Sequence, residues 1–363
     1  MSLSCAIVGV PNVGKTTLFN ALTAAGAATT AYAYSSTEPN LAVVDVPDEN
    51  LGRIAEFIET RRIVPATVSV VDIPGLAAGS SRGEGLGNRF LHHVRETDAL
   101  MHVVRCFENA AVLRDDPVDA AGDIETFELE LALADLDTVT RGVERVAKKA
   151  RTGDKQSLFE QKVFERAKET LESGAQLRSL PWKPEELDAL RPLCLLTQKP
   201  VLYVANVGEQ DLAGEGEHAR AVAARAEATG AGWIALCGDL ECELRRLEGE
   251  ERDLFMSEYG VTELGRDRLI RATYALLGLQ TFYTAGEIEV RAWTIRSGDT
   301  APVAAGKIHT DFLKGFIRAE VYSVEDLFDL HTEAAIRAKG RLRTEGRDYV
   351  MRPNDVCHFL VGR

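Results

Sequence analysis

Residues 9–16 read GVPNVGKT, which is the spacing of a phosphate-binding P-loop. In such a loop glycines let backbone N–H groups approach phosphate oxygens, Lys15 places positive charge beside the β- and γ-phosphates, and the Thr16 hydroxyl can bind Mg²⁺. A helix that begins near Lys15 would point its positive end at the anion. The pattern predicts Mg²⁺-dependent hydrolysis of a nucleoside triphosphate held by Asn12, Val13, Gly14, Lys15, Thr16 and Thr17.

A second group of candidate residues runs from Asp72 to Gly75, directly after a short apolar stretch. Asp72, at the end of a strand, can reach Mg²⁺ through a water molecule, and the Gly75 amide can meet the γ-phosphate. The next residue is Leu76, where many related hydrolases carry a glutamine that orients the attacking water. Leucine has no polar group, so either another residue places the water or hydrolysis is intrinsically slow.

A candidate base site follows another apolar stretch, with Asn206, Val207 and Glu209 where a guanine-binding protein would carry Asn-Lys-x-Asp. The aspartate of that motif accepts two hydrogen bonds from the guanine edge. Here the lysine is missing and the carboxylate is one methylene longer, whereas Asn206 can still bond the N6/N7 edge of adenine. We therefore expect ATP to be preferred over GTP; the alternative is that Asn206 only caps a strand.

The elements that position these residues are short buried strands alternating with helical patterns. Apolar, partly β-branched runs at 4–8, 68–71, 99–104 and 200–205 predict the strands of an α/β fold with a parallel sheet, the P-loop NTPase class. Ligands bind such a sheet at the carboxyl ends of its strands, where the polar residues above lie.

Two further modules are expected. Helical patterns at 123–151 and 155–172, joined by a turn signal at 152–154, predict an inserted antiparallel helical hairpin, although two ordinary domain helices would give the same pattern. After residue 277, alternating runs with helical patterns between them predict a small α+β domain. The predicted domains are 1–122 with 190–277 for the nucleotide, 123–189 for the hairpin and 278–363 for the C-terminal domain.

Composition limits the partners. The net charge of −14 argues against DNA binding by the whole surface, and six scattered cysteines do not indicate disulfides. Neither a signal peptide nor an apolar stretch of membrane-spanning length is visible, so we expect a cytoplasmic protein without a membrane partner, and a monomer. Two basic clusters could contact rRNA, although solvated helix faces look the same: Arg141, Arg145, Lys148, Lys149 and Arg151, and Arg337, Lys339, Arg341, Arg343 and Arg347.

The chain as a whole resembles the YchF family, the Obg-like ATPases of the translation-factor class. The motifs that carry the resemblance are residues 12–15, 83–88, 95–97, 104–109, 130–136, 289–294, 305–311, 314–319 and 346–349. The resemblance implies a G domain interrupted by a helical hairpin and followed by a TGS (ubiquitin-like) domain. It also implies ATP hydrolysis, binding to the ribosome (the large subunit or the 70S particle) and a role in translation or stress regulation, with an apolar Leu76 as normal.

Three departures from the family pattern affect the site. Ser36 matches the family's Mg²⁺-binding switch threonine, with Thr37 as the alternative, and Pro74 replaces a small residue. Arg114 stands where the family has a histidine proposed to assist water attack. Arginine stays protonated and cannot be a general base, but it can stabilise transition-state charge, so Arg114 is a catalytic candidate. Neighbouring His92, His93 and His102 are expected to be surface or packing residues.

The resemblance adds one possible cofactor. In related enzymes with an apolar residue in place of the glutamine, an asparagine at the position of Asn12 can ligate K⁺, which would act electrostatically between the phosphates. Two other functions compete with a ribosome-associated ATPase. One is a GTP-driven switch in translation or ribosome assembly, and the other is an ATP-binding scaffold with vestigial hydrolysis.

Overall fold

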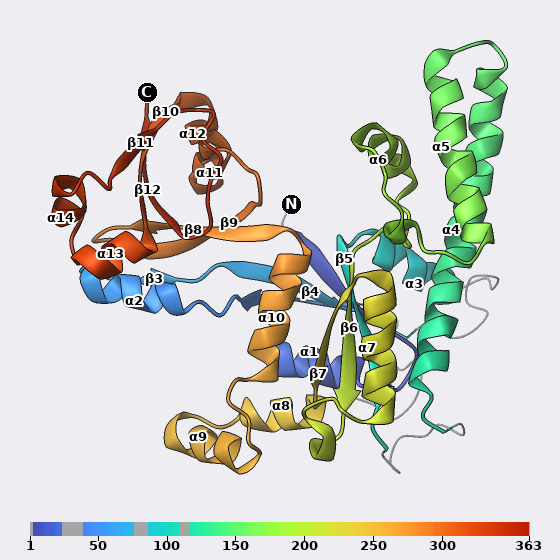
Figure 1. Ribbon diagram of the computed structural model, residues 1–363, viewed down its shortest axis with the longest axis horizontal. Helices are drawn as coiled ribbons and strands as arrows, with labels where there is room; N and C mark the ends of the chain where they lie inside the picture. The colour runs from blue at the N-terminus through green and yellow to red at the C-terminus, as the bar shows by residue number, and fades with distance from the viewer. Residues whose placement is uncertain (1–2, 24–38, 76–85, 109–116, 363) are drawn as a thin grey trace. The chain divides into compact units, whose positions relative to one another are not determined.

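The computed structural model describes residues 3–23, 39–75, 86–108 and 117–362 (Figure 1). Backbone contacts divide the chain into two compact units, one of Met1–Ala42 with Ser69–Leu269 and one of Val43–Val68 with Ile270–Arg363. Residues 43–68, which we assigned to the nucleotide domain, group with the second unit. This grouping reflects backbone contacts only, so the domain borders proposed above stay a prediction.

The first unit is built on a six-stranded sheet in the order β2-β4-β1-β5-β6-β7. β1 pairs in parallel with β4 and β5, β5 with β6, and β6 with β7. The strands are β1 (Ser4–Val8), β2 (Asn40–Asp45), β4 (Thr67–Asp72), β5 (Ala99–Cys106), β6 (Val201–Val207) and β7 (Gly232–Leu236), and the borders between the two units fall within β2 and β4. This arrangement confirms the predicted P-loop fold and brings the carboxyl ends of β1, β4, β5 and β6 to one edge.

Helices cover the central strands of this sheet. All residues of β5 and β6 are buried, as expected for parallel strands with both faces covered. α7 packs on β5, β6 and β7, and α1 packs on β1 and α8. The helices outside the hairpin are α1 (Lys15–Leu22), α3 (Leu86–Arg95), η3 (Glu209–Asp211), α7 (Glu217–Thr229), α8 (Gly238–Leu244), α9 (Gly249–Glu258) and α10 (Gly265–Leu276, which continues into the second unit).

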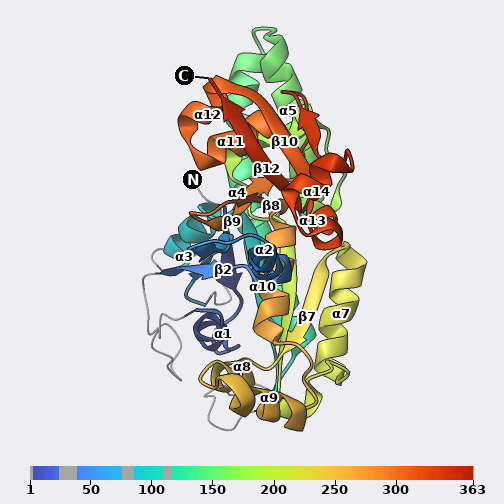
Figure 2. The ribbon, with the colours of Figure 1, turned by 90° about the vertical axis from the view of Figure 1, so that its left-hand side faces the viewer.

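The inserted helices form the predicted hairpin. α4 (Ala120–Ala150) and α5 (Lys155–Glu172) lie side by side in both ribbon views (Figures 1 and 2) and share a core with η1 (Leu177–Ser179), α6 (Pro184–Leu190) and η2 (Arg191–Leu193). Close approach depends on Gly142, because a Cβ there would lie 3.2 Å from the Phe164 ring. Asp154 caps α5 by accepting a 2.9 Å hydrogen bond from the Ser157 amide.

The second unit has a mixed sheet in the order β11-β10-β12-β8-β9-β3, in which β8 pairs antiparallel with β9, β10 antiparallel with β12, and β12 parallel with β8. α11 packs on β9 and β10 around a core that includes Phe282, Ile295 and Phe316. Its elements are α2 (Glu49–Phe57), β3 (Ile63–Val64), β8 (Leu279–Ala285), β9 (Val290–Arg296), α11 (Ala301–Ile308), α12 (Thr310–Gly315), β10 (Phe316–Ser323), α13 (Val324–Leu330), α14 (Glu333–Ala338), β11 (Arg343–Glu345) and β12 (Asp355–Val361). Among the described residues, none of the helices combines the length and apolarity needed to span a bilayer.

Candidate nucleotide-binding site

The P-loop connects the end of β1 to the start of α1 and needs glycine at two of its positions. Gly9 has φ 147°, and a Cβ there would lie 2.4 Å from the Val103 carbonyl oxygen. Gly14 caps α1 with φ 92°, in the left-handed region, and a Cβ there would lie 2.2 Å from Nδ2 of Asn206. The loop is therefore folded tightly between β5 and the base site, with the N-terminus of α1 open to an anion.

Lys15 is a buried cation held by the loop itself. Its side chain is 7 % exposed, and Nζ donates a 2.8 Å hydrogen bond to the Val10 carbonyl oxygen. Burial lowers the pKa of Lys15 to about 8, although the nearby charge of Asp72 acts in the opposite direction. Among the described residues, no carboxylate lies within ion-pair distance of Lys15. An anion beside Nζ would therefore supply the compensating charge that the fold leaves out.

Two of the three predicted Mg²⁺ ligands, Thr16 and Asp72, are brought together. Oγ1 of Thr16 donates a 2.9 Å hydrogen bond to Oδ2 of Asp72, which is 5 % exposed. Burial raises the pKa of Asp72, while the bond from Thr16 and the charge of Lys15 partly oppose that shift. A hydroxyl and a carboxylate oxygen are ligands that Mg²⁺ prefers, so these two residues fit the ion.

Gly75 lies against the P-loop, as its predicted role requires. A Cβ at Gly75 would lie 2.9 Å from the Cα of Pro11 and 3.0 Å from Nζ of Lys15, so its backbone is beside the lysine that meets the phosphates. The remaining predicted residues around the γ-phosphate, Ser36, Leu76 and Arg114, lie outside the described residues. Their roles stay predictions from the sequence.

Asn206 has a bracing role that we did not foresee. It is 4 % exposed, its Nδ2 donates a 2.9 Å bond to the Val13 carbonyl oxygen, and its Oδ1 accepts a 3.0 Å bond from the Gly238 amide. The side chain thus joins the P-loop to the start of α8. It does more than cap β6, and the prediction that it also reads the adenine edge stays a prediction.

The residues after Asn206 differ in what they can offer a base. Val207 is 1 % exposed, so it can present only its backbone, whereas Glu209 is exposed at the start of η3. The Tyr259 hydroxyl donates a 3.4 Å bond to Oε2 of Glu209, and the carboxylate charge raises the pKa of Tyr259. Gly208, between Val207 and η3, has no Cβ, so its backbone is not covered by a side chain of its own.

Two residues of this region were missed from the sequence, Gly238 and Tyr259. Gly238 could have been found because it follows β7, and parallel strands end at the same edge of a sheet. Tyr259 gave no such signal, because it lies far along the chain, at the end of α9. Cys242 also reaches the site, with its Sγ 3.3 Å from the carbonyl oxygen of Thr17.

His92, His93 and His102, which precede Arg114 in the sequence, are surface or packing residues, as expected. His102 is 2 % exposed and packs against Phe127 at a ring distance of 4.3 Å and against Tyr203 at 5.5 Å. Burial, reinforced by nearby cations, lowers its pKa to about 3, so it is a neutral packing residue and not a base. His92 and His93 lie on α3, with His92 exposed and His93 half-buried.

Comparisons with known proteins agree with this geometry. Residues 4–138 match the model of a 50S ribosome-binding GTPase, and residues 279–362 match the YchF GTPase C-terminal model, described as a protein of unknown function (DUF933). The chain is 48 % identical over 363 residues to the ribosome-binding ATPase YchF of Escherichia coli O157:H7, covering 99 % of both, and 45 % identical over 362 residues to that of Bacillus subtilis, again covering 99 % of both.

A solved structure matches over the same length. The Schizosaccharomyces pombe YchF GTPase superposes with a TM-score of 0.86 at 34 % identity, covering 99 % of this chain and 98 % of that one. Full-length sequence identity and this structural match together show that the chain belongs to the YchF family.

Proposed function

We propose that this protein hydrolyses ATP to ADP and phosphate, uses GTP less readily, and binds the ribosome in the cytoplasm as a monomer. The observation that carries the proposal is the meeting of Lys15, Thr16 and Asp72 at the P-loop, beside a base site that lacks the guanine motif. The names of the relatives support the ATPase activity and the ribosome as partner.

In this mechanism each residue acts by positioning or by charge. The P-loop amides and Lys15 hold the β- and γ-phosphates, and Lys15 neutralises charge as the terminal bond breaks. Thr16 and Asp72, with Ser36 as a further candidate, would hold Mg²⁺, which would supply positive charge against the charge that develops on the phosphates. The Gly75 amide would meet the γ-phosphate, and Arg114 would stabilise transition-state charge. K⁺ beside Asn12 is a further proposal that rests on the resemblance alone.

Nucleotide preference is the sharpest test of the site. ATP should displace a fluorescent nucleotide at a lower concentration than GTP, because the motif lacks its lysine and Glu209 is too long for the guanine edge. Glu209→Asp should narrow the ratio of the two affinities several-fold, since the shorter carboxylate can accept both guanine donors. Tyr259→Phe is the matched control, because it leaves the carboxylate in place. Tighter binding of GTP than of ATP to the unaltered protein would refute the ATPase proposal.

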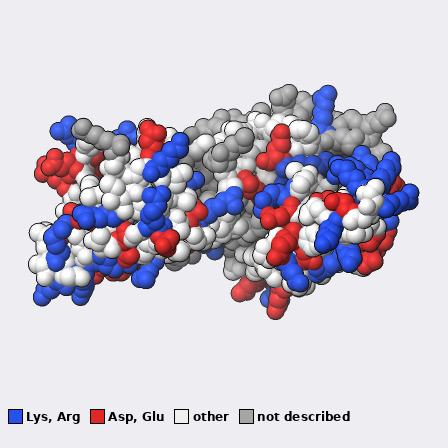
Figure 3. Space-filling view, turned by 90° about the horizontal axis from the view of Figure 1, so that it is seen from above, with Lys and Arg blue, Asp and Glu red and all other residues white. Residues whose placement is uncertain are grey.

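Ribosome binding is proposed to use the basic tip of the hairpin. Arg145, Lys148, Lys149 and Arg151 are exposed, and in the described part of the chain none has a carboxylate within ion-pair distance. The C-terminal cluster differs, because Arg337, Arg341 and Arg343 are already paired with carboxylates. Figure 3 shows Lys and Arg side chains gathered over the hairpin. Unpaired cations release counterions when they meet RNA phosphates, which favours the hairpin tip.

Co-sedimentation with ribosomes checks this surface. Arg145→Glu/Lys148→Glu should weaken binding at least about tenfold, with a shallower salt dependence, because two phosphate contacts are lost. Lys162→Glu/Lys183→Glu makes the same change in net charge at exposed positions away from the tip and should bind like the unaltered protein. Equal loss of ribosome binding in both variants would mean that net charge, and not the tip, governs the interaction.

Single-turnover hydrolysis measured with and without ribosomes separates an ATPase from an ATP-binding scaffold. A scaffold would release no phosphate in either condition.

A further inference from the structure

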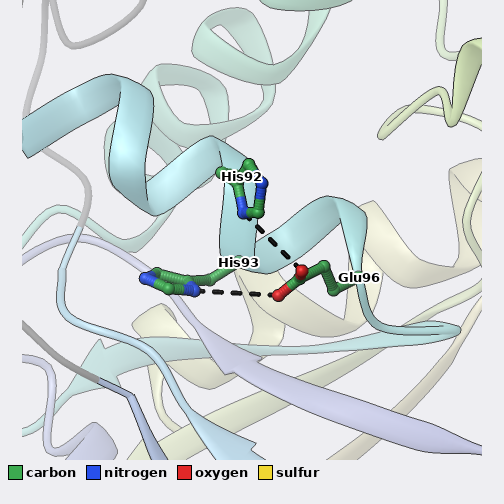
Figure 4. A group of neighbouring side chains, drawn as sticks. All are labelled: His92, His93 and Glu96. Carbon is green, nitrogen blue, oxygen red and sulfur yellow. Dashed lines mark ion pairs between the residues drawn. The ribbon is translucent and has the colours of Figure 1, made fainter.

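A cluster of three potential metal ligands lies at the end of α3, apart from the nucleotide site. Nδ1 of His92 is 3.8 Å from Oε1 of Glu96, and Nδ1 of His93 is 3.9 Å from Oε2 of the same carboxylate. Figure 4 shows both imidazoles directed at Glu96, each facing a different oxygen. One ligand atom from each of the three residues can be chosen so that all lie within 4.8 Å of one another.

We propose that His92, His93 and Glu96 form a binding site for a divalent transition-metal ion of the zinc class. Two imidazole nitrogens and one carboxylate oxygen suit Zn²⁺, which forms bonds of about 2.0–2.2 Å to such atoms. Tetrahedral ligands at that distance lie about 3.3 Å apart. The distances between the three ligand atoms therefore need to shorten by no more than about 1.5 Å. Water would complete the coordination.

Exposure and position both favour this closure. The side chains of His92 and Glu96 are 70 % and 64 % exposed, and that of His93 is 29 % exposed, so they can rotate without disturbing the core. The two histidines lie in the last turn of α3, where the carbonyl ends of the helix favour a cation. The rings meet edge to face, with centroids 5.9 Å apart and planes at 83°, so neither blocks the other from Glu96.

The site is chemically distinct from the proposed Mg²⁺ site. Thr16 and Asp72 offer only oxygen, which Mg²⁺ prefers, whereas the α3 cluster offers two nitrogens. Arg89 and Arg95 on the same helix repel a dication, so we expect weaker binding than at a closed zinc site with four protein ligands. Excess Mg²⁺ should accordingly fail to displace Zn²⁺ from α3.

Calorimetric titration of the full-length protein with Zn²⁺, without nucleotide and in a Cys194→Ser background, tests the proposal. The background removes an exposed thiol that would itself bind zinc. One saturable site is expected in excess Mg²⁺. His92→Ala, His93→Ala and Glu96→Gln should each weaken it by more than about tenfold, since loss of an outer-shell partner alone costs about 10- to 100-fold.

His309→Ala is the matched control, because His309 and Asp311 form an exposed pair at 3.5 Å that, among the described residues, provides two ligand groups where the α3 cluster provides three. It should leave zinc affinity unchanged. Unaltered ATP affinity and circular dichroism would show that the α3 variants are folded. Absence of a saturable site, or zinc binding that survives all three α3 variants, would overturn the proposal and leave His92, His93 and Glu96 as ion pairs only.

Discussion

Lys15→Met should lower the rate of ATP hydrolysis by at least about 10²- to 10³-fold, the usual cost of losing one charge-stabilising donor at a reacting centre. The same change should leave the free energy of unfolding at pH 7 within about 1 kcal/mol of the unaltered protein, or raise it. Lys15 is almost fully buried, and its partner within the described part of the chain is a carbonyl oxygen and not a carboxylate. Burial of this charge therefore lowers the stability of the fold, and the presence of Lys15 is explained by its function and not by stability.

The pH dependence of nucleotide affinity follows from the same residue. Because burial lowers the pKa of Lys15 to about 8, the free protein loses this charge as the pH rises through that value. Bound phosphates favour the ammonium form, so ATP binding should take up a proton above pH 8. The affinity should then fall with rising pH, by at most about tenfold per pH unit.

Stability should change in the opposite direction. The folded-state pKa of Lys15 lies below the ordinary lysine value of about 10.4, so the folded protein binds fewer protons than the unfolded chain between about pH 8 and pH 10.4. The contribution of Lys15 to the free energy of unfolding therefore rises with pH across that window.

Fluorescent-nucleotide displacement between pH 7 and pH 9.5 measures the affinity change, and urea unfolding across the same range measures stability. AMP has no β-phosphate and should show little of the decline seen with ATP. The residual ATP affinity of Lys15→Met should not vary with pH through this group. A decline of equal slope in Lys15→Met would assign the proton to another residue.

How much of the site could be predicted depends on how local its signals are. The P-loop, Asp72 and Gly75 were found because each follows a short apolar run, and the parallel sheet brings the ends of β1 and β4 together. α5 begins at the predicted residue because Asp154 gives a clear N-cap. Turn and cap chemistry acts over a few residues, so the sequence alone reveals it.

Long-range pairings were not predictable in the same way. The side-chain amide of Asn206 is hydrogen-bonded to Val13, 193 residues earlier, and to Gly238, 32 residues later. No sequence periodicity connects those positions. The grouping of residues 43–68 with the second unit depends on the packing of α2 against β8, β9 and α13 and on the parallel pairing of β3 with β9. β3 has two residues and is too short to give a sequence pattern. Side-chain reach and short strands are decided by tertiary packing, which a local pattern does not contain.

The connection between the hairpin and the nucleotide domain depends on one buried carboxylate, Asp135 in α4. Its side chain is fully buried; Oδ1 accepts a 3.0 Å bond from the Leu196 amide, and Oδ2 accepts bonds of 2.7 Å and 2.6 Å from the Thr197 amide and hydroxyl. These donors lie just before β6, whose far end carries Asn206. The contact therefore ties α4 to the strand that positions the base site.

Asp135→Ala should reduce the free energy of unfolding of this protein by about 3–5 kcal/mol. Three donors would be left buried without an acceptor, at about 1–3 kcal/mol each, and partial relaxation would recover some of the loss. Thr197→Val removes only the hydroxyl and should cost about 1 kcal/mol. Asp137→Ala, two residues along α4, breaks an exposed pair with Arg141 and should cost about 0.5 kcal/mol or less.

Urea unfolding followed by circular dichroism and by tryptophan fluorescence measures these differences. Trp182 and Trp233 lie in the first unit and Trp293 lies in the second, so in a Trp293→Phe background the fluorescence follows the unit that Asp135 stabilises. If Asp135→Ala were no more destabilising than Asp137→Ala, the three hydrogen bonds would be replaceable by water, and α4 would not be anchored to β6 through them. The expected order, with Asp135→Ala far above Thr197→Val and Asp137→Ala least, would instead show that desolvated donors, and not net charge, hold the hairpin on the nucleotide domain.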